Sequence, residues 1–137
     1  MLVATKTGSG PGNKLSSSTA LVDFAVNNNG SWNDAIRFGD EDDFSWSLED
    51  KTFECDIQRN RYDTTPLLSL STANGRIIVD SETLRVFHFD VTATDIQSHL
   101  PPGVYVYDFV MVDAFDITDR TVLMSGTLTI TQGVTYP

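Results

Sequence analysis

The chain has 137 residues, 40% of them hydrophobic, which fits one domain large enough to bury a core. Nineteen Asp and Glu against nine Lys and Arg give a formal net charge of −10, which argues against nucleic acid or an anionic membrane as partner. No apolar run reaches the roughly 20 residues of a membrane-spanning helix, and the first residues lack the apolar centre of a secretory signal.

Residues 1–19 are rich in Gly, Ser and Thr, which predicts an extended N-terminal arm ahead of a β-sandwich domain of residues 20–137. We expect this arm to lie on a partner subunit. Its apolar residues Leu2, Val3 and Leu15 are the candidates for that contact.

After the arm, nine short runs, most with apolar residues at every second position, predict about eight β-strands separated by turn signals. In chain order these runs are 21–26, 31–38, 44–48, 52–59, 66–71, 76–79, 84–91, 103–113 and 120–131. Their spacing of about ten residues is typical of an antiparallel β-sandwich, immunoglobulin-like or jelly-roll-like. The fold class is therefore expected to be all-β.

Two local signals predict the connections in the middle of the chain. The pair Asn74-Gly75 favours a tight hairpin between the runs 66–71 and 76–79. The stretch 92–100 is the one expected helix, because Thr92 or Thr94 is able to cap it and prolines follow it.

The last two runs are the longest, and the first of them is apolar on both faces. One face carries Tyr105, Tyr107, Phe109 and Met111, and the other carries Val104, Val106, Val110 and Val112, interrupted by Asp108. In the last run, Val122, Met124, Leu128 and Ile130 are expected to share a face. Because a solvent-facing strand face is normally polar, the valine face is either a seam between subunits or a central strand covered by a loop or the arm.

An ordered series of motifs runs along most of the chain. It consists of Gly30, Trp32, Ile57 with Arg59, Leu67 to Leu70, Asn74-Gly75-Arg76-Ile77, Ala93-Thr94-Asp95, Gly103, Tyr107-Asp108-Phe109, Gly126 to Ile130 and Val134-Thr135. In this order the chain resembles the small β-sandwich of tailed-bacteriophage structural proteins, from about residue 21 to 135. It departs from that pattern at residues 47–52, where the family has Asp-Leu-Thr-Gly.

The resemblance implies a virion component and carries over no catalytic residue. We therefore expect a non-enzymatic structural protein, made in the host bacterial cytoplasm, that acts in tail, baseplate or fibre attachment through contacts with other virion proteins and with copies of itself. A capsid decoration protein on the head surface is the alternative placement. A carbohydrate-binding module for host adsorption is the alternative function, with Trp32, Trp46 and Tyr62 stacking on sugars, although both tryptophans also fit a core.

The remaining reactive residues suggest no catalytic site, cofactor or metal centre. Cys55 alternates with Phe53 and Ile57, which is the pattern of a small buried hydrophobe. The acidic loop that begins at Asp40 and ends at Asp43 is either a solvated loop or a calcium site, and it lacks the alternating order of a helix-loop-helix calcium motif.

Overall fold

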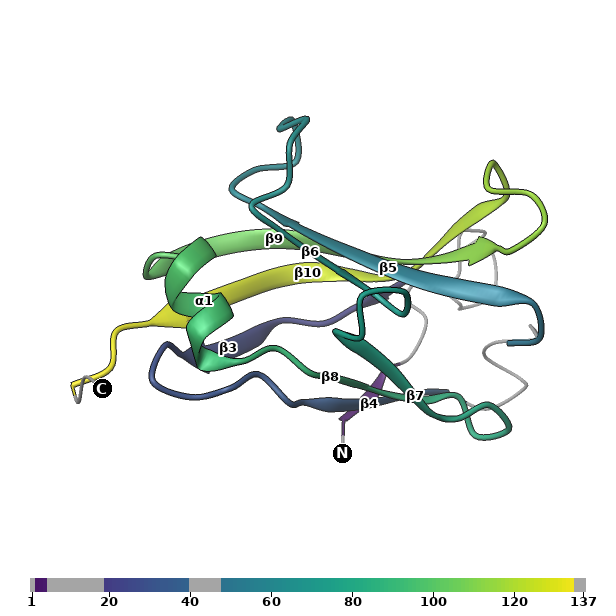
Figure 1. Ribbon diagram of the computed structural model, residues 1–137, viewed down its shortest axis with the longest axis horizontal. Coiled ribbons are helices and arrows are strands. Elements are labelled where there is room, and N and C mark those ends of the chain that lie inside the picture. The colour runs from purple at the N-terminus through teal and green to yellow at the C-terminus, as the bar shows by residue number, and fades with distance from the viewer. Residues whose placement is uncertain (1, 5–18, 40–47, 135–137) are drawn as a thin grey trace, which may run out of the picture.

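The computed structural model describes residues 2–4, 19–39 and 48–134, and these form two β-sheets packed face to face with one short helix (Figure 1). The predicted all-β sandwich is thereby confirmed. The strands are β1 (Leu2–Ala4), β2 (Ala20–Leu21), β3 (Phe24–Asn27), β4 (Ala35–Phe38), β5 (Lys51–Gln58), β6 (Leu68–Ser71), β7 (Ile77–Ser81), β8 (Val86–Phe89), β9 (Gly103–Asp113) and β10 (Arg120–Thr131). The helix α1 (Ala93–His99) joins β8 to β9.

The order of strands in the sheets is that of an immunoglobulin-type sandwich. We refer to the sheet with order β1-β4-β8-β7 as sheet A, and to the sheet with order β2-β10-β9-β5-β6 as sheet B. These orders correspond to the A-B-E-D and G-F-C-C′ sheets of that fold. One departure is that β1 joins β4 in parallel. The strands β2 and β3 both run parallel to β10.

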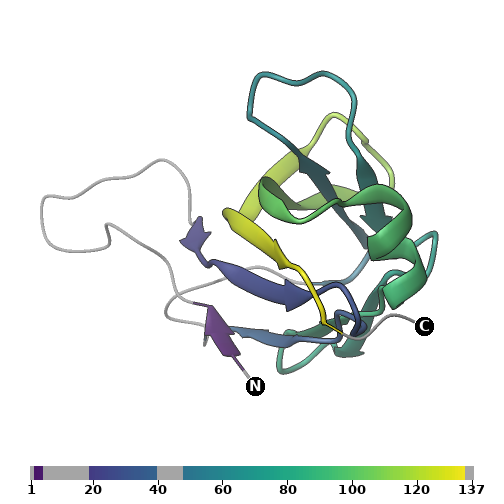
Figure 2. The same cartoon turned by 90° about the vertical axis from the view of Figure 1, so that its left-hand side faces the viewer.

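Local signals along the chain account for most of these elements. The bounds of β9 and β10 match the predicted runs 103–113 and 120–131. The helix α1 begins after Thr92, whose side chain accepts a hydrogen bond from the Asp95 amide, as an N-cap residue does. Figure 2 shows α1 beside the sandwich, where it carries the chain from sheet A to sheet B.

The sequence pattern was less accurate at the N-terminal side. The predicted run 21–26 is divided into β2 and β3, and within 31–38 only Ala35–Phe38 forms a strand. The first residues of the predicted arm also belong to the sandwich, because β1 pairs with β4 and Ala4 is buried. The run 44–48 lies almost wholly outside the described residues.

The Asn74-Gly75 turn does not close a hairpin, contrary to the prediction, because β6 belongs to sheet B and β7 to sheet A. Asn74 holds the turn by accepting hydrogen bonds from the amides of Ser71 and Arg76, and Gly75 adopts a φ of 79°. Such a φ is readily available only to glycine. The turn therefore carries the chain from one sheet to the other.

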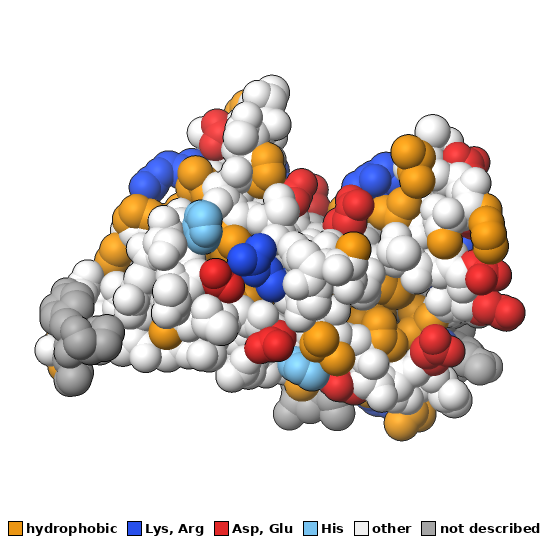
Figure 3. Space-filling view, in the orientation of Figure 1, with side chains coloured by type: hydrophobic (Ala, Val, Ile, Leu, Met, Phe, Trp, Pro, Cys, Tyr) orange, Lys and Arg blue, Asp and Glu red, His pale blue; other side chains and the backbone are white. Residues whose placement is uncertain are grey.

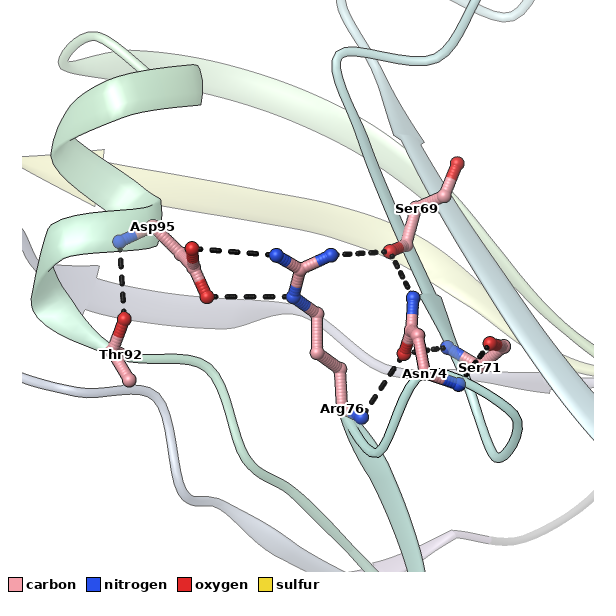
Figure 4. A network of polar contacts seen from close by, with 6 residues as sticks. All are labelled: Ser69, Ser71, Asn74, Arg76, Thr92 and Asp95. Carbon is pink, nitrogen blue, oxygen red and sulfur yellow. Dashed lines mark hydrogen bonds and ion pairs between the residues drawn. The ribbon is translucent and has the colours of Figure 1, made fainter.

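A polar network covers the free edge of β6 next to this turn (Figure 4). The side chains of Asn74 and Arg76 both donate to the carbonyl of Ser69, at 3.0 and 3.3 Å. Arg76 also binds both carboxylate oxygens of Asp95 in α1. An added strand would need the Ser69 carbonyl as a hydrogen-bond acceptor. Because the two side chains already donate to this carbonyl, they protect the edge from pairing with another chain.

A β-bulge in β10 overturns one predicted face. Val122 pairs with Val110, but Met124 pairs with Phe109, so Leu123 is an extra residue in the ladder. Paired residues point to the same side of a sheet, so Val122 shares the outer face with Val110 and not the core face with Met124.

The chain runs close beside β10 at the break between β2 and β3. The Val22 amide donates to the Ser125 carbonyl, and the Val22 carbonyl accepts from the hydroxyl of Tyr107 at 2.6 Å. Tyr107 pairs with Gly126, and a Cβ built on Gly126 would lie 1.9 Å from the Val22 carbonyl oxygen. The absence of a side chain at Gly126 is what admits the Val22 backbone.

Replacing Gly126 with Ala is therefore expected to destabilise the fold by about 1–3 kcal/mol or more, the usual cost of overpacking. The urea midpoint should fall accordingly in equilibrium unfolding followed by tryptophan fluorescence. Gly30→Ala is the matched control, because a Cβ at Gly30 would lie 3.7 Å from the nearest atom, the Asn27 carbonyl oxygen, which is an ordinary contact distance. An equal midpoint for Gly126→Ala and Gly30→Ala would contradict the packing argument.

Candidate functional site

The outer face of sheet B carries a shallow groove, which we call the saddle. Its hollow of about 180 Å³ lies over β5 and β9. The lining residues are Glu54, Asp56, Gln58, Arg61, Val106, Tyr107, Asp108, Val110 and Arg120. Because successive side chains of a strand alternate between faces, Val106, Asp108 and Val110 point outward while the aromatic residues between them fill the core.

Charged side chains form most of the saddle, and two ion pairs join them. Arg120 donates to Glu54 at 2.6 Å, and Arg61 donates to Asp108 at 3.0 Å. Asp56 lies directly opposite Asp108 in the ladder of β5 and β9. The saddle thus places two carboxylates side by side between two half-buried valines, Val106 and Val110.

Two loops rise above sheet B on either side of the saddle (Figures 1 and 3). The first follows β5 and contributes Arg61 to the groove, and the second joins β9 to β10 and ends at Arg120. Figure 3 shows charged side chains of both signs in the hollow between the two prominences. Tyr62 is 94% exposed on the first loop, and Phe115 and Ile117 are 84% and 73% exposed on the second.

The β9–β10 loop is held in place by its own carboxylates. One Asp113 oxygen accepts from the amides of Phe115 and Asp116, and the other accepts from Lys51 at 3.0 Å. Asp116 in turn accepts from both the amide and the hydroxyl of Thr118. These bonds fix the backbone on both sides of the exposed apolar side chains, so the loop presents them in a defined arrangement.

The four predicted interface valines do not form a continuous apolar seam. Val104 is exposed, and Val106 and Val110 are half-buried, all on the outer face. Val112 is only 3% exposed. Because polar residues of β5 and β10 neighbour these valines in the ladder, the face is mixed in character. A contact between subunits at this face remains a prediction.

The three residues considered for sugar stacking have different environments. Trp32 is 1% exposed and stacks on Phe89 with ring centroids 4.1 Å apart, so the hypothesis that it stacks on a sugar is wrong and it packs in the core. Tyr62 is free to meet a ligand. Trp46 lies outside the described residues.

The other predicted contacts are only partly described. Leu2 and Val3 belong to β1, whose backbone pairs with β4 of the same chain. Leu15 and the acidic loop from Asp40 to Asp43 lie outside the described residues, and the arm contact and the calcium hypothesis stay predictions.

Cys55 is buried in the core, and burial raises the pKa of its thiol well above the usual value. A buried thiol of this kind is unreactive. Within residues 2–4, 19–39 and 48–134, no three His, Cys, Asp or Glu side chains are grouped to hold a metal ion.

Phe115 and Ile117 belong to none of the predicted strands or sites, so the sequence did not identify them as surface residues of note. The available signal was the alternation of these large apolar residues with Asp and Thr in a segment too short to form its own core. The ion pairs of the saddle had no such signal, because they join residues 47 and 66 positions apart.

No protein-family model matches this chain, and no curated protein sequence matches it significantly. In the described part of the chain, no helix has the length and apolar character needed to span a membrane.

Asp113 is expected to control the order of the β9–β10 loop. Its pKa is lowered, first by the hydrogen bond from Lys51 and then by the Phe115 amide. The ordering effect is thus present above about pH 4, the usual range of an Asp carboxyl, and is lost as the pH falls through the lowered pKa. In ¹⁵N relaxation, Asp113→Ala should reduce the order parameters of residues 114–118 from about 0.85 to below about 0.6.

Asp119→Ala is the control for this measurement, because it removes a carboxylate of the same loop that receives none of these bonds. Equal order parameters in the wild type and Asp113→Ala would show that the loop is held by other contacts.

Proposed function

We propose that this chain is a non-enzymatic structural protein of a tailed-bacteriophage virion, acting in tail, baseplate or fibre-attachment assembly through contacts with other virion proteins and with copies of itself. The ordered motif resemblance supports the virion setting. The geometry supports a contact-making role, because the groove is shallow and its carboxylates Glu54 and Asp108 are engaged in ion pairs.

The observation that carries this proposal is the β9–β10 loop. Single exposed apolar residues are ordinary on protein surfaces, but here Phe115 and Ile117 stand on a projecting loop that Asp113 and Asp116 hold by hydrogen bonds. An ordered loop loses little conformational freedom on binding. Burying each of these side chains against a partner contributes about 1.5–3 kcal/mol.

A carbohydrate-binding role is favoured by one observation, the exposure of Tyr62 next to Arg61 on the other loop. Aromatic rings with a free face and a nearby hydrogen-bond donor suit sugar rings. This role is compatible with a virion protein that contacts the host, and glycan-array binding that is lost in Tyr62→Ala would favour it over assembly alone.

The virion setting is tested by immunogold electron microscopy of purified phage particles from the source that encodes the chain. We expect gold label on intact particles at the tail or baseplate. Label on the head surface would favour the capsid decoration alternative. Protein found only in the soluble fraction, with no label on particles, would contradict the proposal.

The contact-making loop is tested by replacing Phe115 and Ile117 together with Ser. Incorporation into particles, measured by quantitative mass spectrometry, should fall at least tenfold, because two apolar contacts of more than 1.4 kcal/mol in total are lost. Leu84→Ser is the control, since Leu84 is also exposed but lies in the β7–β8 turn of sheet A. Equal incorporation of both variants would exclude this loop as a contact.

A further inference from the structure

We propose that the saddle binds an extended segment of another protein that places one arginine side chain between Asp56 and Asp108, with apolar neighbours against Val106 and Val110. The identification of that protein as a virion component rests on the function proposed above. The binding chemistry rests on the groove itself.

The charges within the groove are not balanced. Arg61 is engaged with Asp108 and Arg120 with Glu54. Within the described part of the chain, the Asp56 carboxylate receives no hydrogen bond or ion pair, although it faces Asp108 directly across the ladder. Like charges placed opposite each other destabilise a sheet. The groove therefore lacks one positive charge at this point.

The groove is small, and part of its lining is apolar. Its hollow of about 180 Å³ is smaller than the roughly 300–1,000 Å³ of sites for whole small molecules. It therefore suits a single side chain better than a free ligand. Val106 and Val110 lie in the lining on either side of Asp108, so apolar surface flanks the position of the missing charge.

The combination of paired carboxylates and apolar walls favours arginine. Its guanidinium is planar and weakly hydrated, and it offers five donors arranged to meet carboxylates. Its alkyl stem packs against apolar surface while the charged end remains hydrogen-bonded. A lysine would supply the charge but not the same match to two neighbouring carboxylates.

The charge of the groove argues against two copies of this chain meeting groove to groove. Three carboxylates and two guanidiniums line each groove, a net charge of −1, so two grooves brought face to face enclose a net charge of −2. The whole chain carries −10, so two copies also repel each other at longer range. A basic segment of a different protein is attracted both by the net negative charge of the groove and by the net negative charge of the whole chain.

The test is an NMR titration of the ¹⁵N-labelled protein with the peptide acetyl-Val-Arg-Val-amide, at low salt. We expect saturable shifts at the amides of Val106, Asp108 and Val110 with a millimolar Kd, and no comparable shifts with acetyl-Val-Gln-Val-amide. Asp56→Asn should weaken binding of the arginine peptide at least fivefold while the fold remains intact. Glu82→Gln removes the same charge from an exposed site in the β7–β8 turn and should leave Kd unchanged.

Several outcomes would overturn the proposal. These are equal shifts with the glutamine peptide, shifts centred elsewhere on the molecule, or the same loss of affinity in Glu82→Gln and Asp56→Asn. A solution mass of two chains by light scattering that returns to one chain in Val106→Asp would show that a second copy occupies the groove. Because the titration uses purified protein alone, its failure is distinct from a failure to find the chain on particles.

Discussion

The long antiparallel pair of β9 and β10 is the constraint on which both the core and the saddle depend. These strands span eleven and twelve residues and form the centre of sheet B, so each residue of β9 is committed to one of two environments. The inward side chains, such as Tyr107 and Phe109, are fully buried. A shift of one residue in the pairing would exchange the core face for the outer face. The burial of the aromatic side chains therefore also fixes the position of Asp108 in the saddle.

Gly126 secures this register from the other side of β10. Because Gly126 has no side chain, the Val22 backbone is able to approach β10 there, and its carbonyl accepts a hydrogen bond from the Tyr107 hydroxyl. The break between β2 and β3 is therefore tied to one point of the ladder. The bulge at Leu123 has the complementary effect, because it turns Val122 outward while keeping Met124 in the core. The apolar character of the outer face is thus partly a consequence of how the core is packed.

Features set by neighbouring residues could be predicted from the sequence, whereas features set by distant pairing could not. The strand bounds of β9 follow from alternation. The start of α1 follows from a local cap, for which the sequence offered Thr92 or Thr94 and the structure uses Thr92. The Asn74-Gly75 turn was predicted with the right residues but the wrong consequence, because the pattern of a strand does not say which sheet it joins. For the saddle, alternation placed Val106 on the outer face. The pairing of Asp108 with Arg61 depends on a loop whose position no local pattern specifies.

The protected edge of β6 and the open outer face of sheet B differ in how a partner would be received. An added strand at β6 would have to displace Asn74 and Arg76 from the Ser69 carbonyl and break the pair of Arg76 with Asp95. At the saddle the situation is reversed, because Asp56 stands opposite a like charge and a partner cation would relieve that repulsion. Association through backbone pairing is therefore opposed at this edge, and the proposed association at the face would be made by side chains. A contact made by side chains discriminates between partners by their charge, and a contact made by backbone pairing does not.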